Sequence, residues 1–435
     1  MLAEAEAAAR RTPSDHDRFD ARAWAFATLD PASSTDLDQA YFLERSGDDI
    51  IIQYAIADVA FFVDRGSKLE AEAWKRGSTV YAPDGRVPQY PEVLSEGAAS
   101  LLPDQDRAAI IMTVSVAPDG TPVLLQTRRA IIRSRAKLGY ENVTPAEIGE
   151  ILPDLAARIA AAEDRRGSPR IEFPEQEVET DPSSPGGLRL VARDRLPSED
   201  QNAALSLAAN LAVAQRLLGA NVGLFRVMAE PADRAIGALH HVANALGVAW
   251  PRDTTARELA PRLNATNPKH AALLRSLRRA GGGASYAIFD PEQAPWHSAI
   301  AAPYAHATAP LRRLADRYVL DLLVDLEAGV VADQSTLDLL AALPDAMERA
   351  ESRANNVERA AIDLVEAVLL AGRVGQVFEA VVTDTDRDSA TIQLAEPAVR
   401  ARTAAPGVSP GDTIKVRLVT AHPSARQVTF ELVHR

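Results

Sequence analysis

Cysteine is absent from this chain of 435 residues, which excludes disulfides, thiolate metal sites and cysteine nucleophiles. A membrane span is absent as well, because polar residues interrupt every apolar stretch, as Ser206 and Asn210 do in the most promising one. The N-terminus is acidic where a secretion signal is basic. These absences leave a cytoplasmic enzyme or binding protein, with no membrane association, whose length suits two or three domains.

Positive charge is in deficit, with a formal net charge of −13. This balance argues against a protein that coats nucleic acid non-specifically, although cations gathered in one groove can still bind it. Such a gathering occurs at Arg128, Arg129, Arg133, Arg135 and Lys137, with no acid between them. Taken alone, the run predicts a solvated face rather than a binding site.

The residue pattern changes along the chain. A short helix or arm over 1–23 precedes a region of β-branched and turn residues, and a helix-rich middle follows it. A helix over 68–76 has Ser67 and Glu70 as its capping box and Gly77 at its end. Pro344 should end a short helix over 337–343, and a longer helix should run from there to about residue 370. The other predicted elements are strands over 50–56, 109–116 and 122–129 and helices over 199–218, 254–279 and 311–326.

Short strands return after Gly372, at 374–383, 390–394, 413–419 and 428–432, separated by Asp-, Pro- and Gly-rich turns. This pattern predicts a small barrel, with the OB fold as the leading candidate and a β-domain without a ligand as the alternative. The expected fold class is therefore α+β, with a main domain over 24–371 and the barrel over 372–435.

Three carboxylates lie in a turn-rich segment between Leu29 and Ala40, at Asp30, Asp36 and Asp38. Asp36 and Asp38 are two residues apart, so in an extended chain they point the same way and repel each other. Such a cluster needs a cation or raised pKa values to persist, and oxygen-only ligands suit magnesium, which activates water at a phosphodiester. The alternative from this segment alone is a turn whose carboxylates cap backbone amides.

Several longer motifs follow in order along the chain. They are Ile56-Ala-Asp58-Val59, the stretch from Asp64 to Gly85, Pro88-Gln-Tyr-Pro91, Leu94-Ser-Glu-Gly-Ala-Ala-Ser-Leu101 and Tyr304-Ala-His306-Ala-Thr308-Ala-Pro310-Leu-Arg312-Arg313-Leu-Ala-Asp316. In these motifs the chain resembles the catalytic RNB domain of the ribonuclease II/R family, in a short bacterial form without N-terminal cold-shock domains. The resemblance covers nearly everything after residue 24 and implies that the barrel is S1-like.

The resemblance implies a processive, magnesium-dependent 3′→5′ exoribonuclease that hydrolyses single-stranded RNA to 5′-nucleoside monophosphates in RNA degradation or processing. It implies that Asp30, Asp36, Asp38 and Gln39 hold one or two magnesium ions, with manganese as an expected substitute. The family has an acid where Gln39 stands, so the second metal should bind more weakly. Asp36, Asp38 and Arg312 are implied as catalytic, with Arg312 at the scissile phosphate.

Further residues are implied in RNA binding. Tyr81 and Phe173 match an aromatic clamp on the 3′-terminal nucleotide, and stacking suits an enzyme that is indifferent to sequence. Arg313 follows Arg312 in a helix expected to begin at Pro310, where backbone amides and arginines face an anion. The remaining predicted RNA contacts are Arg128, Arg129, Arg133 and Arg135, with Phe378 as the stacking aromatic of the barrel.

Alternatives stay open. Instead of stacking on a nucleotide, Tyr81 and Phe173 could be core aromatics. Instead of contacting the phosphate, Arg312 could form an intrahelical ion pair with Asp316. For the whole chain, one alternative is an RNA-binding protein of the same fold whose hydrolysis is weakened or lost because Gln39 replaces an acidic ligand. Another is a deoxyribonuclease on the same scaffold, because the choice of RNA requires recognition of 2′-hydroxyls.

A second departure from the family lies on the central helix. Ala203 and Ala204 stand where the family has a pair of glutamates, with Glu199, Asp200 and Asn202 just upstream. The role of that site is therefore left open. No obligate protein partner is evident, and a monomer is expected.

Overall fold

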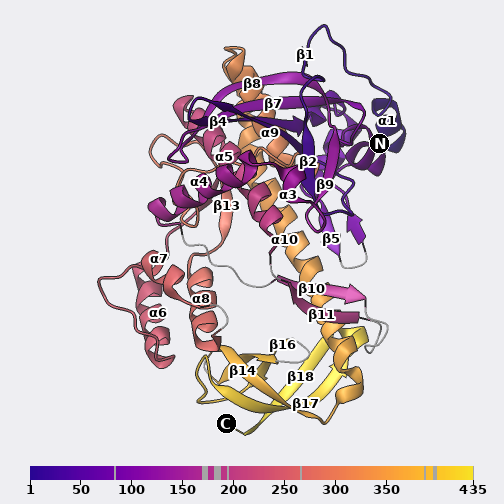
Figure 1. The fold of residues 1–435 in the computed structure, drawn as a ribbon. Coiled ribbons are helices and arrows are strands. Elements are labelled where there is room, and N and C mark those ends of the chain that lie inside the picture. Colours follow the sequence, from indigo (N-terminus) through magenta and orange to yellow (C-terminus); the bar gives the residue numbers. More distant parts are fainter. Residues whose placement is uncertain are drawn as a thin grey trace.

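The computed structural model describes residues 1–82, 85–168, 175–180, 188–193, 195–264, 267–386, 388–394 and 399–434. A larger upper part contains the N-terminus, and a smaller lower part ends in the C-terminal barrel (Figure 1). Helices and sheets are both present, as the α+β prediction requires. The helices are α1 (Leu2–Ala8), α2 (Lys68–Arg76), α3 (Pro145–Ile148), α4 (Ile151–Arg166), α5 (Pro197–Gly219), α6 (Asp233–Ala245), α7 (Ala256–Leu259), α8 (Pro268–Ala280), α9 (Leu314–Glu327) and α10 (Gln334–Leu370).

A mixed seven-stranded sheet forms the framework of the upper part, in the order β1-β8-β7-β4-β3-β2-β9. The strands from β8 to β2 pair antiparallel, whereas β1 joins β8 and β9 joins β2 in parallel. The predicted strands at 50–56, 109–116 and 122–129 fall in β4, β7 and β8, so these predictions are confirmed. The strands are β1 (Phe19–Asp20), β2 (Ala27–Asp30), β3 (Gln39–Ser46), β4 (Asp49–Ala57), β7 (Asp106–Val116), β8 (Pro122–Arg133) and β9 (Ala136–Gly139).

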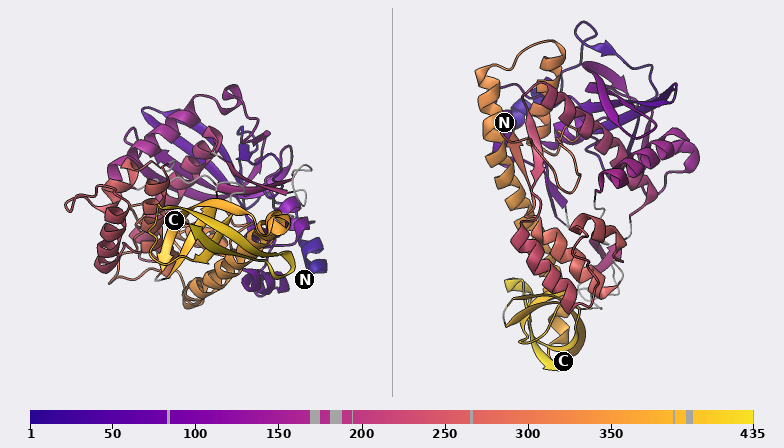
Figure 2. Two further views of the ribbon diagram at one scale, coloured as in Figure 1. Left: turned by 90° about the horizontal axis from the view of Figure 1, so that it is seen from below. Right: turned by 90° about the vertical axis from the view of Figure 1, so that its left-hand side faces the viewer.

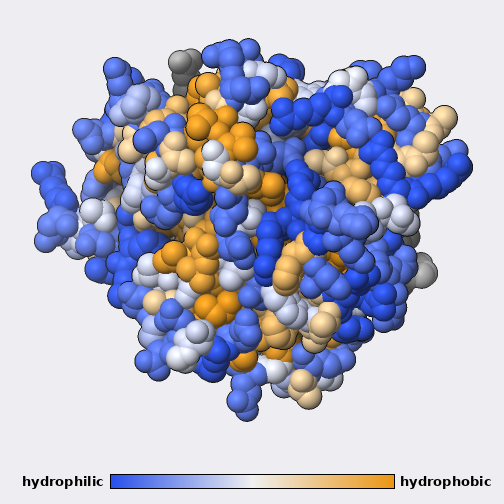
Figure 3. Space-filling model, turned by 90° about the horizontal axis from the view of Figure 1, so that it is seen from above, coloured by the Kyte–Doolittle hydropathy of each residue, from blue (hydrophilic) through white to orange (hydrophobic). Residues whose placement is uncertain are grey.

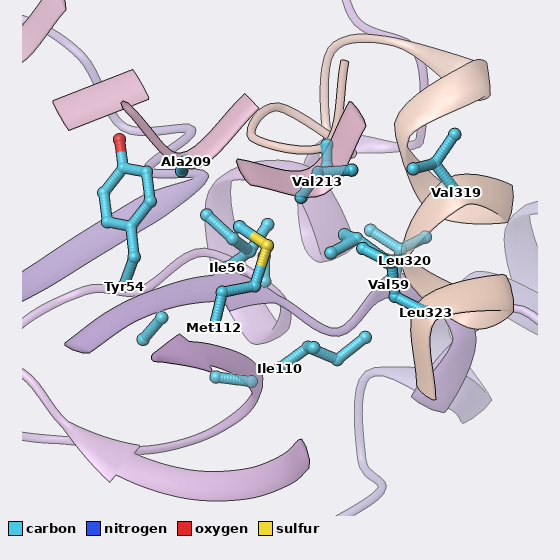
Figure 4. Packing of buried hydrophobic residues seen from close by; sticks show 14 of the residues in the cluster. Tyr54, Ile56, Val59, Ile110, Met112, Ala209, Val213, Val319, Leu320 and Leu323 are labelled. Atoms are coloured by element: carbon cyan, nitrogen blue, oxygen red, sulfur yellow. The ribbon is translucent and has the colours of Figure 1, made fainter. Parts of the chain in front are cut away.

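Two helices pack on this sheet. Ile56 of β4 and Met112 of β7 point toward Val213 of α5 and Leu320 of α9 (Figure 4). All four side chains are buried, and burying an aliphatic side chain of this size stabilises the fold by about 1.5–3 kcal/mol. The packing brings α5 and α9 together over one sheet although about 100 residues separate them in sequence.

The helix α10 is continuous through Pro344, so the predicted break at that residue is wrong. An internal proline costs about 3 kcal/mol because it removes one backbone hydrogen bond and crowds the preceding turn. Leu340, Leu343 and Met347 are buried on one face of the helix around the proline, and this apolar packing offsets the cost. The helix runs from the upper part down to the barrel (Figures 1 and 2).

Three two-stranded ribbons complete the described strands outside the barrel. They are β5 (Val80–Ala82) with β6 (Gly85–Val87), β10 (Glu175–Thr180) with β11 (Leu188–Arg193), and β12 (Leu224–Met228) with β13 (Ala284–Ile288). The helices α6, α7 and α8 are inserted between β12 and β13 and bury an apolar cluster of their own. The single helix-prone stretch predicted over 254–279 is therefore two separate helices, and α6 was missed.

Five strands close the C-terminal barrel in the order β14-β15-β16-β18-β17. Its interior is a separate apolar cluster that includes Val382, Ile392 and Leu418. The predicted class, an α+β chain with a small S1-like OB-type barrel at its end, is confirmed. The proposed domain limits at residues 23 and 371 stay predictions. The strands are β14 (Val377–Asp386), β15 (Ser389–Leu394), β16 (Arg400–Ala404), β17 (Thr413–His422) and β18 (Gln427–His434).

No helix in the described ranges is both long and apolar enough to cross a lipid bilayer.

A buried acid joins α10 to the barrel and gives a prediction for stability. Glu366 is 3% exposed and accepts a hydrogen bond from the backbone amide of Arg400 at 2.8 Å. Burial raises the pKa of Glu366 from 4.5 to about 7, so the folded protein binds a proton that the unfolded chain has already lost. Between these values stability falls as pH rises, by up to about 3 kcal/mol in total. Glu366→Gln should therefore raise the melting temperature at pH 8 and leave it nearly unchanged at pH 4.5.

Calorimetric melts of the protein at both pH values measure this effect. Glu431→Gln, at an exposed position of β18, is the matched control and should change neither melt. An equal shift of the Glu366→Gln melt at both pH values would contradict the raised pKa.

Candidate active site

A cavity of about 370 Å³ opens where the loop between β2 and β3 meets α5, β5 and the loop before α9. The loop between β2 and β3 is the acidic segment of the sequence, and these two strands are neighbours in the main sheet. The cavity therefore brings together segments from the first hundred residues and from beyond residue 300. Its described lining comprises Asp30, Pro31, Ser34, Asp36, Gln39, Tyr81, Tyr140, Asn202, Ser206, Asn210, Tyr304, Thr308, Ala309, Arg312 and Arg313.

Asp38 lies directly behind this lining and is fully buried. Its Oδ1 accepts a hydrogen bond from the backbone amide of Leu311 at 2.6 Å, and its Oδ2 accepts one from Arg312 Nε at 2.6 Å. Burial raises the pKa of Asp38 to about 6, although the positive charge of Arg312 opposes the shift. The carboxylate thus holds the loop that carries Arg312.

Asp30 ends β2 and reaches the cavity with a carboxylate that is only partly satisfied. Its Oδ2 is buried and accepts no hydrogen bond from the described residues. Burial raises the pKa of Asp30 to about 7, with Arg312 opposing the shift and Asp38 and Asp36 adding to it. A buried carboxylate oxygen without a donor is costly, so this atom is suited to receive a cation.

Asp36 and Gln39 also reach the cavity but already have partners. Asp36 accepts a hydrogen bond from Arg86 Nη1 at 2.8 Å and a longer one from the Tyr81 hydroxyl at 3.3 Å. Gln39 Oε1 accepts one from Ser206 Oγ at 3.4 Å. In the described part of the chain, no three His, Asp or Glu side chains form a ready metal-binding group. A cation here would take one or two carboxylates and complete its shell with water and phosphate, as magnesium does.

Arg312 and Arg313 lie in the loop before α9, not in its first turn. The helix begins at Leu314, so the predicted start at Pro310 is wrong. The reason is a backbone pairing, because Thr79 donates to the Arg312 carbonyl at 2.9 Å and Arg313 forms an isolated β-bridge with Ser78. This pairing holds Arg313 in an extended conformation and fixes the loop beside β5.

The two arginines have different partners. Arg312 donates to Asp38, so the alternative of an ion pair with Asp316 is not seen. Arg313 instead binds Asp316 through two hydrogen bonds of 2.9 and 2.7 Å. Among the described residues, no hydrogen-bond acceptor is found for Nη1 or Nη2 of Arg312. Since Arg312 lines the cavity, these two nitrogens are available to an anion there.

Tyr81 lies on the short strand β5, is 50% exposed and lines the cavity, so it is not a residue of the core. Phe173, the second predicted aromatic, lies outside the described residues. Phe378 is on β14 and packs edge-on against Phe430 with ring centroids 6.1 Å apart. Its ring is therefore partly engaged by the barrel core.

The basic run is not brought to the cavity. Arg129 forms ion pairs with Asp58 and Asp321, and Arg128 lies over the ring of Phe19 at 3.5 Å. The upper end of the molecule is mostly hydrophilic, with apolar side chains gathered toward the middle (Figure 3). Arg128 and Arg129 have different partners because neighbouring residues of a strand point to opposite faces, so the two side chains leave β8 on opposite sides. The remaining partners are Asp106 for Arg133, the Arg22 carbonyl for Arg135 and the Ala32 carbonyl for Lys137.

Sequence reasoning missed most of the uncharged wall of the cavity. Asn202, Ser206 and Asn210 recur every four residues along α5, and this spacing places them on one face of the helix. Polar residues at helical spacing in an otherwise apolar helix were the signal that could have identified them. Asn202 donates to the Tyr140 hydroxyl at 2.6 Å, and Asn210 donates to the Tyr304 hydroxyl at 3.0 Å.

Comparisons with known proteins add relatives. Ribonuclease R of Mycoplasma pneumoniae is 29% identical over 396 residues, which is 84% of this chain and 54% of that protein. The chain thus spans about half the length of this curated relative. The structure of the apo form of Mycoplasma genitalium RNase R matches with a TM-score of 0.87 at 22% identity, covering 100% of this chain and 75% of that one. The same enzyme in complex with ribose methylated single-stranded RNA gives a TM-score of 0.86 at 22% identity and the same coverage.

Two family models together cover most of the sequence. The model of the RNase II-type exonuclease C-terminal S1 domain matches residues 376–433, where the barrel lies. The model of the RNB domain matches residues 18–328, which include the sheet, the acidic loop and the arginine loop. Since this second match spans well over half of the sequence and every cavity-lining residue, the chain belongs to the RNB family.

Proposed function

We propose that this chain is a processive exoribonuclease that removes nucleotides from the 3′ end of single-stranded RNA and releases 5′-nucleoside monophosphates. The observation that carries the proposal is the ion pair of Asp38 and Arg312 near the buried Asp30 oxygen, which has no donor among the described residues. Relatives named Ribonuclease R, and a related structure that holds single-stranded RNA, support the choice of substrate. The cavity then receives the 3′ end of the RNA.

The residues present fit a divalent cation, and we propose magnesium, with manganese as a substitute. Asp30 offers a carboxylate oxygen with no donor among the described residues, and Gln39 lines the same cavity with an amide oxygen that accepts a long hydrogen bond from Ser206. Asp36 and Asp38 are within the same predicted ligand set but already bind Arg86 and Arg312. When bound, the cation supplies positive charge for the phosphodiester and lowers the pKa of water.

The arginine loop supplies the fixed positive charge of the site. Hydrolysis joins a water oxygen to the terminal phosphorus and breaks the bond from phosphorus to O3′, so the released nucleotide keeps the phosphate. Negative charge grows on the phosphate oxygens as this happens. Arg312, oriented by Asp38 through Nε, turns its remaining donors toward that charge without having to reorganise.

Tyr81→Ala should weaken the binding of short RNAs, because the half-exposed ring is proposed to stack on the 3′-terminal base. Base–aromatic stacking contributes about 1–3 kcal/mol, so the affinity for a short oligomer should fall by roughly one to two orders of magnitude. Long RNAs have other contacts and should lose proportionally less. The final fragment left from a labelled oligomer should become longer.

Tyr81→Phe is the matched control, since it keeps the ring and removes only the hydroxyl bonded to Asp36. It should keep most of the affinity for short RNA. An unchanged final fragment in Tyr81→Ala would place the ring outside the nucleotide site.

The proposed function is tested with one RNA labelled at either its 3′ or its 5′ end, incubated with and without magnesium. Release of the 3′ label as a mononucleotide only with magnesium is the expected result. Fragments of mixed length would indicate internal cleavage, and binding without release would indicate an RNA-binding protein without hydrolysis. A DNA oligomer of the same sequence, degraded equally fast, would contradict selectivity for RNA. The monomeric state and the cytoplasmic location also stay predictions.

A further inference from the structure

The hairpin that carries Tyr81 is anchored unevenly. β5 packs against α10, and Ser78 and Thr79 just before it pair with the arginine loop. Among the described strands, β6, which carries Arg86, pairs only with β5. Tyr81 and Arg86 stand directly opposite each other across the two strands. Whatever fixes Arg86 therefore also fixes Tyr81.

Arg86 is held by two separate segments of the chain. Its Nη1 donates to Asp36 at 2.8 Å, and its Nη2 donates to the Thr35 hydroxyl at 2.5 Å in the same acidic loop. Its Nε donates to Glu96 at 3.1 Å, in the π-helical segment 93–98. The guanidinium is therefore a fork that joins the hairpin, the acidic loop and this third segment, which a single ammonium group cannot reproduce.

The partners of Arg86 are themselves fixed. Thr35 donates through its hydroxyl to Glu96 at 2.6 Å, and its carbonyl accepts a hydrogen bond from Ser100 at 2.7 Å. The Tyr81 hydroxyl donates to the same Asp36 carboxylate that Arg86 binds. Both members of the cross-strand pair thus end on one acid, which ties the position of the aromatic ring to the acidic loop.

Arg86 is absent from the described lining of the cavity, although its side chain lies on the same face of the ribbon as Tyr81 and binds Asp36, which does line the cavity. Each of its three nitrogens already donates to a protein acceptor. Any effect of Arg86 on the RNA end must therefore act through Tyr81 and Asp36.

We propose that Arg86 is a positioning residue for the 3′-terminal nucleotide, because it fixes the hairpin so that Tyr81 presents its ring to the cavity. This inference rests on the proposed stacking role of Tyr81. In this proposal Asp36 also anchors Arg86, in addition to any contact it makes with a metal ion. Glu96 anchors Arg86 as well, although it is not among the described residues that line the cavity.

The test uses a short RNA with 2-aminopurine at its 3′ terminus and buffer containing EDTA, so that binding is measured without hydrolysis. Stacking quenches the fluorescence of this base. Arg86→Ala should lose most of the quenching and bind the short RNA roughly tenfold more weakly, a part of the full stacking energy. Arg86→Lys and Glu96→Gln should give intermediate losses, because each keeps part of the fork.

A double variant separates positioning from direct contact. Arg86→Ala combined with Tyr81→Ala should bind no more weakly than Tyr81→Ala alone, because the two residues act as one unit. The salt dependence of binding to long RNA should also be unchanged in Arg86→Ala, since no phosphate contact is lost. Arg45→Ala, which breaks an exposed ion pair with Asp154, is the control and should leave the quenching intact.

The outcomes distinguish this inference from the proposed function. Unchanged quenching in Tyr81→Ala would contradict the stacking role and overturn both. Loss of quenching in Tyr81→Ala with full quenching in Arg86→Ala would overturn the inference alone. Additive losses in the double variant, with a smaller salt dependence, would show that Arg86 contacts RNA directly, which also overturns it.

Discussion

Replacement of Asp38 by asparagine is expected to reduce RNA hydrolysis by at least about a thousandfold while RNA binding survives. Asp38 accepts hydrogen bonds from two donors, the Leu311 amide and Arg312 Nε. Asparagine has one oxygen and one NH₂ group, so one of these donors would face another donor. The variant also removes the charge that pairs with Arg312, and loss of one preorganised group at a transition state costs about 10²–10³ by itself.

Single-turnover rates at saturating RNA and magnesium measure this loss, and fluorescence anisotropy measures the binding. Asp154→Asn, at a surface position of α4 paired with Arg45, is the matched control and should keep full activity. Near-normal turnover of Asp38→Asn would show that the hydrolytic centre lies elsewhere.

Arg312→Lys is expected to lower the single-turnover rate by about 10²–10³ and to change the affinity for long RNA little. Arginine can donate through Nε to Asp38 and still offer Nη1 and Nη2 to the phosphate. Lysine has a single ammonium group, which cannot hold the buried carboxylate and reach the phosphate with the same geometry. The interaction that is lost belongs mainly to the transition state, so the rate falls more than the binding.

The matched control is Arg402→Lys, which changes an exposed arginine of the barrel paired with Asp386. It should leave the rate unchanged. A raised KM with a normal rate in Arg312→Lys would mean that Arg312 binds the RNA backbone and takes no part in the chemical step.

Local signals in the sequence predicted local structure well. In the helix over 68–76, Ser67 Oγ accepts from the Glu70 amide and Gly77 ends the helix with a positive φ, as predicted. The Glu70 side chain accepts from the Gly66 amide and not from that of Ser67, so only half of the predicted capping box forms. Such features depend on neighbours within one turn, so the sequence contains all the information they need. The barrel and the main strands were predicted for the same reason, because alternation and turn residues are local patterns.

Features that depend on distant partners were predicted less well. The start of α9 shifted from Pro310 to Leu314 because residues 77–79 pair with the loop, a contact that no local pattern reveals. The basic run looked like one cationic surface, yet Arg129 forms an ion pair with Asp321, a residue that is distant in the sequence. Arg86 was not singled out, since its role appears only when Asp36 and Glu96 are seen beside it.

The motifs located the site but not its arrangement. The family resemblance singled out Asp30, Asp36, Gln39, Tyr81 and Arg312, and these residues line one cavity. That Asp38 lies behind the wall, holding the arginine loop, required the structure. In the sequence, Asn202 drew attention only because it lies just before Ala203 and Ala204, where the family has two glutamates. The structure shows that it shares one face of α5 with Ser206 and Asn210.

Asp38 and Arg312 are 274 residues apart, so a ribosome completes the acid long before the arginine. At about 5–20 residues per second, this interval lasts roughly 15–50 s. During that time the nascent polypeptide contains the acidic loop but lacks the Arg312 guanidinium and the Leu311 backbone amide, which Asp38 binds in the folded protein. The arrangement of Asp38 and Arg312 therefore cannot form while the first half of the chain is being translated, and it is complete only when the loop before α9 emerges and closes onto the acidic loop.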